Sequence, residues 1–176
     1  MITIMLTHMQ NLPHSMRIFR KGQYLFHQRD PITSMFLIES GEARLIRRQR
    51  NGGVVVLQRA LAASCLAEAS LFKSNYHCDA IAMTRVSARL VSKSAMRKLF
   101  ECDREFAEAW AHRLADEVQN ARLRAEILSY RTVGERFQAW VAVTGRIPKK
   151  GTWKSVAQDI GTSPEALYRE IARRRS

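Results

Sequence analysis

The feature that most constrains the fold is a 28-residue stretch from Asp103 to Tyr130 that contains neither glycine nor proline. Its apolar residues recur at steps of three and four, which is the spacing of one face of an α-helix. Such a helix spans about 42 Å, so it either connects two bodies or pairs with a copy of itself. The alternative is an ordinary core helix of one monomer. The near-heptad order favours pairing, and the predicted dimer-interface residues are Phe106, Trp110, Leu114, Val118, Ala121, Ala125 and Leu128.

The charge of the chain indicates a polyanionic partner. The net charge is +13 over 176 residues, and the sequence pI is near 10.5. Residues 131–176 carry 10 Lys and Arg against 4 Asp and Glu, so this segment is more than twice as basic per residue as the rest. Nucleic acid fits this distribution better than an acidic membrane does.

Cysteine usage and the absence of long apolar runs predict a cytoplasmic protein with no membrane partner. The three cysteines are an odd number and form no CxxC pair, which indicates a reducing compartment without a disulfide framework. No apolar run approaches the roughly 18 residues of a membrane span. The first ten residues, MITIMLTHMQ, lack the positive flank and the cleavage site of a secretory signal.

From Met16 onward, short segments rich in β-formers alternate with turn residues. This regular spacing predicts an antiparallel sandwich or jelly roll, and with the helices that follow the fold class is α+β. Residues 66–72 interrupt the pattern with small residues and one carboxylate, Glu68, and we expect a short helix there of the kind that carries a ligand site. The predicted strands are Arg17–Phe19, Tyr24–Phe26, Met35–Glu39, Ala43–Arg47, Val54–Gln58, Asp79–Met83 and Ser87–Val91.

The remaining helices are predicted from capping signals. Ser94 is the expected N-cap of a helix that starts at Ala95, and Thr132 and Glu135 form a capping box. A short helix capped by Thr152 is followed by a Gly-Thr-Ser turn and by a last helix with Pro164 in its first turn. A short helix is also expected within residues 1–15. Two helices joined by a glycine-containing turn inside a basic segment are typical of a helix-turn-helix.

These patterns resemble the Crp/Fnr family of bacterial transcription regulators. The resemblance implies a β-roll sensor domain related to cyclic-nucleotide-binding domains, a dimer formed by the long helix, and a DNA-binding C-terminal domain. As an ordered set the matching segments are specific. They are Phe19–Phe26, Gln28–Pro31, Met35–Gly41, Glu68–Phe72 and Trp153–Arg173.

The sensor site departs from the family pattern. In cyclic-nucleotide binders of this family a Gly-Glu pair holds the ribose, and an Arg followed by Ser or Thr holds the cyclic phosphate. The aligned residues here are Ala67 with Glu68 and Cys78 with Asp79, which are the candidate effector-pocket residues. An anion would meet repulsion where it needs a bidentate cation, so cyclic-nucleotide binding is not expected. Arg85 is the first candidate for a substitute cation.

Other cofactors and catalysis also lack support. The iron–sulfur cluster of the Fnr branch needs an N-terminal cysteine cluster, and residues 1–15 contain no cysteine. Haem needs an axial ligand, for which His77 and Cys78 are candidates, but adjacent strand residues point to opposite faces. We expect Cys78 to be a small buried apolar residue and His77 to lie at the surface, while a redox role for Cys65 or Cys78 stays open. No catalytic motif is present, so the sequence predicts neither an enzyme nor a metal site.

The predicted DNA-binding residues lie mostly in the last helix. Glu165 can accept a hydrogen bond from cytosine, and Arg169 can donate two to guanine; both match the family's Glu…Arg pair. Many members carry an arginine just before that Glu, where this sequence has Pro164, so we expect a different base preference. The other candidates are Lys154, Thr162, Ser163, Ala166 and Arg173, with Lys149, Lys150, Arg174 and Arg175 as further phosphate contacts or solvated charges.

Together these observations predict three parts: a sensor domain at 1–102, a dimerisation helix at 103–130 and a helix-turn-helix domain at 131–176. The sequence ends at Ser176, so the family's β-hairpin wing is missing from it, through truncation or loss. The predicted function is a dimeric, sequence-specific regulator that binds double-stranded DNA, with RNA polymerase as a further candidate partner. The alternative is a stand-alone ligand-sensing or protein-interaction module with a degenerate DNA-binding domain.

Overall fold

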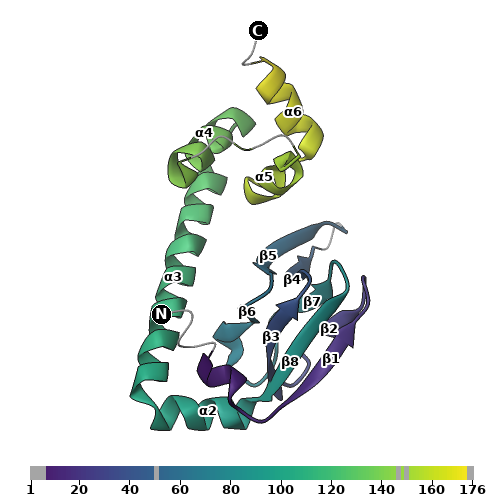
Figure 1. The fold of residues 1–176 in the computed structure, drawn as a ribbon. Helices are drawn as coiled ribbons and strands as arrows, with labels where there is room; N and C mark the ends of the chain where they lie inside the picture. Colours follow the sequence, from purple (N-terminus) through teal and green to yellow (C-terminus); the bar gives the residue numbers. More distant parts are fainter. Residues whose placement is uncertain (1–6, 50–51, 146–147, 149–150, 174–176) are drawn as a thin grey trace. The chain divides into compact units, whose positions relative to one another are not determined.

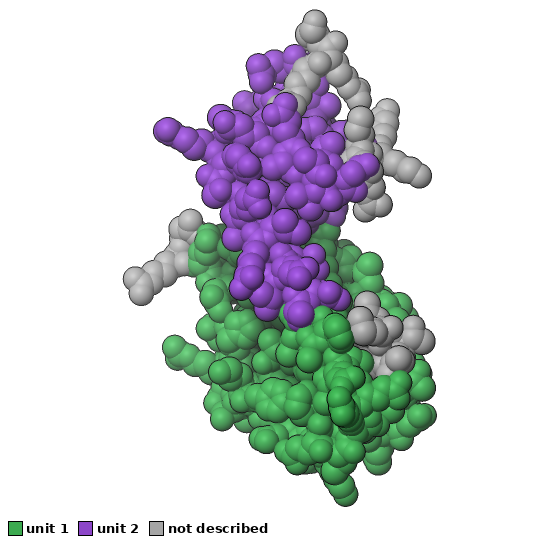
Figure 2. Space-filling model, turned by 90° about the vertical axis from the view of Figure 1, so that its left-hand side faces the viewer, with its two compact units in different colours: residues 1–114 green, residues 115–176 purple. Residues whose placement is uncertain are grey.

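The computed structural model of the chain describes residues 7–49, 52–145, 148 and 151–173. The chain divides into two compact units, Met1–Leu114 and Ala115–Ser176, which Figure 2 shows in different colours. We describe each unit by itself.

Unit 1 is built on two antiparallel sheets of four strands each (Figure 1). This arrangement confirms the predicted α+β fold class with an antiparallel β-roll. The first sheet has the order β1 (His14–Phe19), β8 (Val86–Ser92), β3 (Ser34–Ser40) and β6 (Ser64–Leu66). The second sheet has the order β2 (Tyr24–Phe26), β7 (Asp79–Ala82), β4 (Ala43–Arg48) and β5 (Val54–Ala60).

The core of unit 1 contains side chains from both sheets and from two helices, α2 (Lys93–Cys102) and α3 (Arg104–Ser129). The Phe26 ring stacks on Tyr76 with 3.6 Å between centroids, and its other neighbour is Phe36 at 5.5 Å. Phe106 and Trp110 of α3 are 0% and 1% exposed and belong to the same cluster. Because each fully buried side chain of this size contributes roughly 1.5–3 kcal/mol, the start of α3 is a structural part of the β-roll.

Several details of the predicted elements were wrong. Every predicted strand exists with ends shifted by at most three residues, but β6 was missed because its three residues include no β-branched or aromatic side chain. The expected short helix is a single 3-10 turn, η1 (Glu68–Ser70). The N-cap of α2 is Ser92, whose hydroxyl accepts a hydrogen bond from the Ala95 N–H at 3.1 Å, and Ser94 lies inside the helix.

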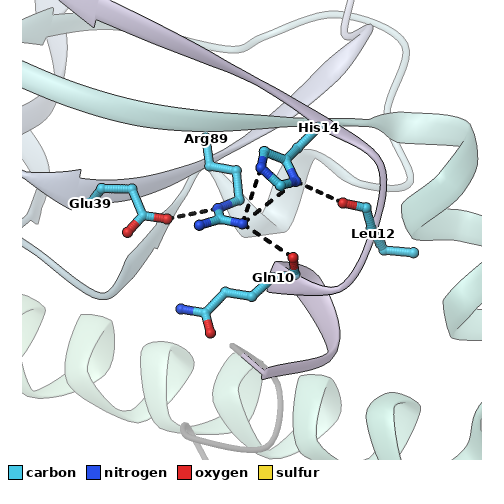
Figure 3. A network of polar contacts seen from close by, with 5 residues as sticks. All are labelled: Gln10, Leu12, His14, Glu39 and Arg89. Atoms are coloured by element: carbon cyan, nitrogen blue, oxygen red, sulfur yellow. Dashed lines mark hydrogen bonds and ion pairs between the residues drawn. The ribbon is translucent and has the colours of Figure 1, made fainter.

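A charged network ties the N-terminal segment to the first sheet (Figure 3). The Arg89 Nε donates to the Glu39 carboxylate at 2.7 Å, and its Nη1 donates to the Gln10 carbonyl at 3.1 Å. The His14 ring lies beside the same guanidinium, and His14 Nδ1 is 2.8 Å from the Leu12 carbonyl oxygen. Residues 7–10 are helical, as expected for this segment. Arg89 therefore joins β8, β3 and the chain that precedes β1.

Unit 2 consists of the end of α3 and of three helices, α4 (Val133–Thr144), α5 (Trp153–Asp159) and α6 (Pro164–Arg173). Its core residues are Ile127, Phe137, Trp140, Trp153, Val156, Ala157, Ile160 and Leu167. The capping box of α4 is confirmed, since the Thr132 hydroxyl accepts the Glu135 N–H and the Glu135 carboxylate accepts the Thr132 N–H. Thr152 occupies the N-cap position of α5, but its side chain makes no capping hydrogen bond.

Among the described residues, no helix combines the length and the apolar character that a membrane crossing requires.

Candidate nucleic-acid interface and sensor site

The turn between α5 and α6 holds the two helices in a fixed relation. Gly161 has φ +65, and a Cβ at this position would lie 2.6 Å from Leu128 Cδ2. The Thr162 N–H donates to the Ala157 carbonyl at 2.8 Å. The left-handed backbone and the close neighbour both disfavour a side chain at this position, so the turn between the two helices requires glycine. The predicted helix–turn–helix arrangement is present in unit 2.

The first turn of α6 presents its polar residues to solvent. The Ser163 hydroxyl accepts a hydrogen bond from the Ala166 N–H at 3.2 Å, so Ser163 is the N-cap of α6. It lies in the Gly-Thr-Ser turn that was predicted to precede this helix. Leu167 is fully buried and anchors the helix, whereas Glu165 and Arg169 are exposed on the opposite face. At 3.6 residues per turn these two residues are neighbours on the helix surface.

Glu165 lies within the electrostatic influence of two cations. Hydrogen bonds to its carboxylate from its own backbone N–H and from Ser163 lower the pKa of Glu165, and the charges of Lys154 and Arg169 lower it further. The structure therefore brings an acceptor, Glu165, together with two cations from different helices. In DNA-binding proteins, groups of these kinds contact base edges and phosphates.

The other predicted DNA contacts differ in their surroundings. Thr162 and Ala166 are partly buried, and the Tyr168 side chain is 47% exposed. Arg173 forms a two-pronged ion pair with Glu170, with its Nη2 and Nε 3.0 and 3.2 Å from the carboxylate oxygens, so its guanidinium already has an acidic partner. The further phosphate candidates Lys149, Lys150, Arg174 and Arg175 lie outside the described residues.

The predicted dimer-interface residues fall into two groups along α3. Phe106 and Trp110 are buried in the core of unit 1, which is the role that the alternative reading gave to the helix. Leu114 is partly buried against that core. Val118, Ala121, Ala125 and Leu128 are exposed, with Val118 at 48% and Leu128 at 39%. The C-terminal half of α3 therefore carries an apolar stripe whose side chains are largely exposed.

The exposed stripe continues toward the start of α3 through different residues from those predicted. Ala107 is partly exposed and Ala111 is exposed. With these two replacing Phe106 and Trp110, the stripe has strict steps of four and three. Its members are Ala107, Ala111, Leu114, Val118, Ala121, Ala125 and Leu128. Sequence reasoning chose the bulkier residues at each turn, although the alanines keep the heptad period better.

The sensor residue Glu68 is held by side chains of its own unit. It is 4% exposed, and the Gln58 amide nitrogen lies 3.0 Å from both of its carboxylate oxygens. Arg113 Nη2 of α3 lies 3.6 Å from Glu68 Oε1, and the Arg113 side chain is 21% exposed. The Gln58 carbonyl oxygen also accepts the Ala67 N–H at 3.4 Å. Strand β5 and helix α3 thus each supply a partner for this carboxylate.

Sequence reasoning missed Gln58 and Arg113. The available signal was the spacing of Phe106, Trp110 and Arg113 at steps of four and three, which places all three on one face of α3. Cys65 lies nearby in β6, and burial, followed by the negative charge of Glu68, raises its pKa well above the usual value. The Cys65 thiol therefore stays protonated at neutral pH.

Cys78 and Asp79 lie in surroundings of their own. Cys78 is 1% exposed, and burial raises its pKa to about 11. Asp79 Oδ1 accepts the Gln28 N–H at 2.8 Å and lies 3.7 Å from His27 Nδ1, so the carboxylate stabilises the chain after β2. His77 is exposed. Cys78 and His77 thus occupy the buried and surface positions that we expected.

Arg85 is not part of the Glu68 site. It lines a separate groove with residues of the β1–β2 turn, so its predicted place as a substitute cation for a bound cyclic phosphate is not supported. In the part of the chain that the structure describes, no three His, Cys, Asp or Glu residues are grouped so that they could hold a metal ion.

Comparison with known proteins gives the family. The model of the cyclic nucleotide-binding domain family matches residues 16–103, which is half of the chain. The comparison of the sequence with curated proteins found no match.

Solved structures share the fold at low sequence identity. FixK2 from Bradyrhizobium japonicum has a TM-score of 0.73 and 18% identity, over 92% of this chain and 84% of its own. The c-di-GMP responsive global regulator CLP of Xanthomonas campestris has a TM-score of 0.70 and 16% identity, over 99% and 90%. The catabolite activator protein of Thermus thermophilus has a TM-score of 0.59 and 21% identity, over 98% and 81%. The chain therefore belongs to the cyclic nucleotide-binding domain family and has the fold of the Crp/Fnr transcription regulators.

Proposed function

We propose that the chain is a dimeric transcription regulator that binds specific sequences of double-stranded DNA. The observation that carries this proposal is the exposed face of α6, where Glu165 and Arg169 lie beside Lys154 of α5. The anchoring of α6 through Leu167 and the Gly161 turn gives this face a fixed geometry. A rigid helix with a hydrogen-bond acceptor and two cations suits the major groove.

Dimerisation through α3 is the second part of the proposal. The exposed stripe from Ala107 to Leu128 is rich in alanine, so two helices can approach closely along it. A two-fold dimer presents two copies of α6, and its binding site is then a palindrome with half-sites about one helical turn apart. In this division residues 1–102 are the sensor, 103–130 the dimerisation helix and 131–176 the DNA-binding part.

The third part concerns the effector. Gln58 and Arg113 already satisfy the Glu68 carboxylate without a ligand, and the positions aligned with the phosphate-binding pair are Cys78 and Asp79. We infer a regulator whose sensor site does not take a cyclic nucleotide in the usual way. In calorimetry we expect cyclic AMP to bind no tighter than about 1 mM, and micromolar affinity would contradict this inference.

The test of DNA binding is to select the preferred duplex from a random pool and then compare three single variants over a salt series. Arg169→Ala should cost roughly 1–3 kcal/mol on the selected site and relax the preference at one base pair of each half-site. Lys154→Ala should weaken binding to all sequences alike and lower the salt slope by about one. Lys98→Ala is the control: it removes one positive charge from the exposed face of α2, which is outside the predicted DNA-binding segment. It should change neither the DNA affinity nor the salt slope appreciably.

Two outcomes would contradict the base-reading role of α6. One is that no palindrome emerges from the selection. The other is that Arg169→Ala and Lys154→Ala lose affinity equally on every sequence. A chain that binds no duplex even at low salt would instead favour the ligand-sensing or protein-interaction module.

A further inference from the structure

A groove of about 720 Å³ on unit 1 lies apart from the Glu68 site. Its lining residues are Ile18, Arg20, Lys21, Gln23 and Arg85. They come from the end of β1, from the β1–β2 turn and from the residue before β8. Neither Gln58 nor Arg113, the partners of Glu68, lines this groove.

The groove carries three cations that lack acidic partners. In the described part of the chain, the side chains of Arg20, Lys21 and Arg85 form no ion pair and no hydrogen bond. By contrast, Arg89, Arg97 and Arg104 each pair with a glutamate. Three like charges around one groove repel one another, and an anion bound between them relieves that repulsion.

The backbone on one side of the groove is fixed by hydrogen bonds. The Gly22 N–H donates to the Ala82 carbonyl at 2.8 Å, and the Ala82 N–H donates back to the Gln23 carbonyl at 2.9 Å. The Gln23 side-chain oxygen accepts the Arg20 N–H at 2.6 Å. The turn that carries Arg20 and Lys21 is therefore attached to the end of β7, three residues before Arg85.

The backbone on the other side is fixed by close packing. A Cβ on Gly41 would lie 2.2 Å from the Arg85 carbonyl oxygen, so the two turns are in direct contact. The Thr84 hydroxyl accepts the Glu42 N–H at 2.9 Å and so holds the same turn. Both backbone segments that carry the cations are thus ordered before any ligand arrives, which lowers the entropic cost of binding.

We propose that this groove binds a small organic phosphate, such as a phosphomonoester. The volume is that of a small-molecule site, and two guanidinium groups with one ammonium group match the geometry and charge of a phosphate dianion. The Ile18 side chain, which is 55% exposed, offers an apolar wall for the organic part. The site is a second ligand position on the β-roll, and it does not depend on the proposed DNA-binding function.

Calorimetry on the full chain at about 150 mM salt tests the proposal with three probes: inorganic phosphate, pyrophosphate and 5′-AMP. Arg85→Ala and Lys21→Ala should each weaken binding of the organic phosphate by about tenfold or more, because each removes a charge-assisted contact. Lys98→Ala removes one positive charge from α2 and should leave the affinity within about twofold, which separates a local contact from general attraction. All three side chains are exposed, so the variants should fold normally.

Two results would overturn the proposal. If all three variants weaken the probes equally, the attraction reflects net charge rather than a site. If no probe binds but Arg85→Ala and Lys21→Ala each lower the salt slope of DNA binding by about one, the groove holds backbone phosphates of DNA instead. If Arg169→Ala abolishes DNA binding but the probes still bind, the result bears on the DNA-binding role of α6 and leaves the groove proposal unaffected.

Discussion

Replacing Gly41 by alanine should destabilise unit 1 far more than the same replacement at Gly22. Both glycines have nearly the same backbone, with φ +88 at Gly41 and +85 at Gly22. Their surroundings differ, because a Cβ at Gly22 meets nothing within 4 Å, whereas one at Gly41 lies 2.2 Å from the Arg85 carbonyl oxygen and 2.9 Å from Thr84 Oγ1. Gly22→Ala therefore isolates the backbone strain, and the difference between the variants isolates the close approach.

The expected magnitudes follow from these contacts. A non-glycine residue in the left-handed region costs roughly 1–2 kcal/mol, offset by about 0.4–1 kcal/mol from the less flexible unfolded chain. Gly22→Ala should thus cost about 1 kcal/mol or less. At Gly41 the turn at Thr84 and Arg85 must move by nearly 1 Å, which strains the Glu42–Thr84 hydrogen bond. Overpacking and a lost hydrogen bond add roughly 2–4 kcal/mol.

The assay is urea unfolding of unit 1 followed by the fluorescence of Trp110, which is buried in its core. Trp140 and Trp153 belong to unit 2 and are replaced by Phe in the shared background of both variants. We expect Gly41→Ala to lower the free energy of unfolding by at least about 1.5 kcal/mol more than Gly22→Ala does. Equal losses, within about 0.5 kcal/mol, would show that the close approach of Gly41 to Arg85 has no energetic weight.

Three further predictions concern the dimer, the sensor site and the thiols. Val118→Glu should give monomers in sedimentation because it places a charge on the exposed apolar stripe. The control Gln119→Glu on the same helix should leave the dimer intact. If Val118→Glu remains dimeric, α3 is not the dimer interface. A double-mutant cycle of Glu68→Gln with Arg113→Met should show a coupling of roughly 0.5–3 kcal/mol in urea unfolding, and additive effects would argue against the ion pair. At pH 8, iodoacetamide should modify the exposed Cys102 before the buried Cys65 and Cys78, as measured by mass spectrometry. Because burial raises the pKa of Cys78 from 9.0 to about 11, its thiol ionises at a lower pH in the unfolded chain than in the folded one. The contribution of Cys78 to the free energy of unfolding should therefore fall as the pH rises from about 9 to 11.

The elements were predictable where local chemistry determines them. The Thr132–Glu135 capping box needs only a Glu three positions after a Thr, and the structure contains both of its hydrogen bonds. The long helix was equally clear, since 26 of the 28 predicted residues form α3. Strand β6 had no such signal, because its three residues include no β-branched or aromatic side chain, unlike the equally short β2.

The surroundings of Glu68 could not be predicted by aligning the sequence with the family motif. Glu68 was identifiable, but its partners Gln58 and Arg113 lie 10 and 45 positions away, on β5 and α3. The family motif grouped Glu68, Cys78 and Asp79 in one predicted effector pocket. In the structure, the Glu68 carboxylate bonds to Gln58, whereas the Asp79 carboxylate bonds to the Gln28 backbone. Which cation reaches a buried carboxylate depends on how a helix packs on a sheet, and spacing alone does not contain this information.

By itself the sequence determined the α+β class, the long helix, the basic C-terminal helices and the identity of the residues on the face of α6. These features rest on periodicity, capping and charge, which act over a few residues of chain. Only the tertiary structure decided which face of α3 is buried, moving Phe106 and Trp110 into the β-roll core and leaving Ala107 and Ala111 on the exposed stripe. Both faces of that helix are apolar, so the local pattern is degenerate, and the choice between them is made by the volume and shape of the core that the sheets provide.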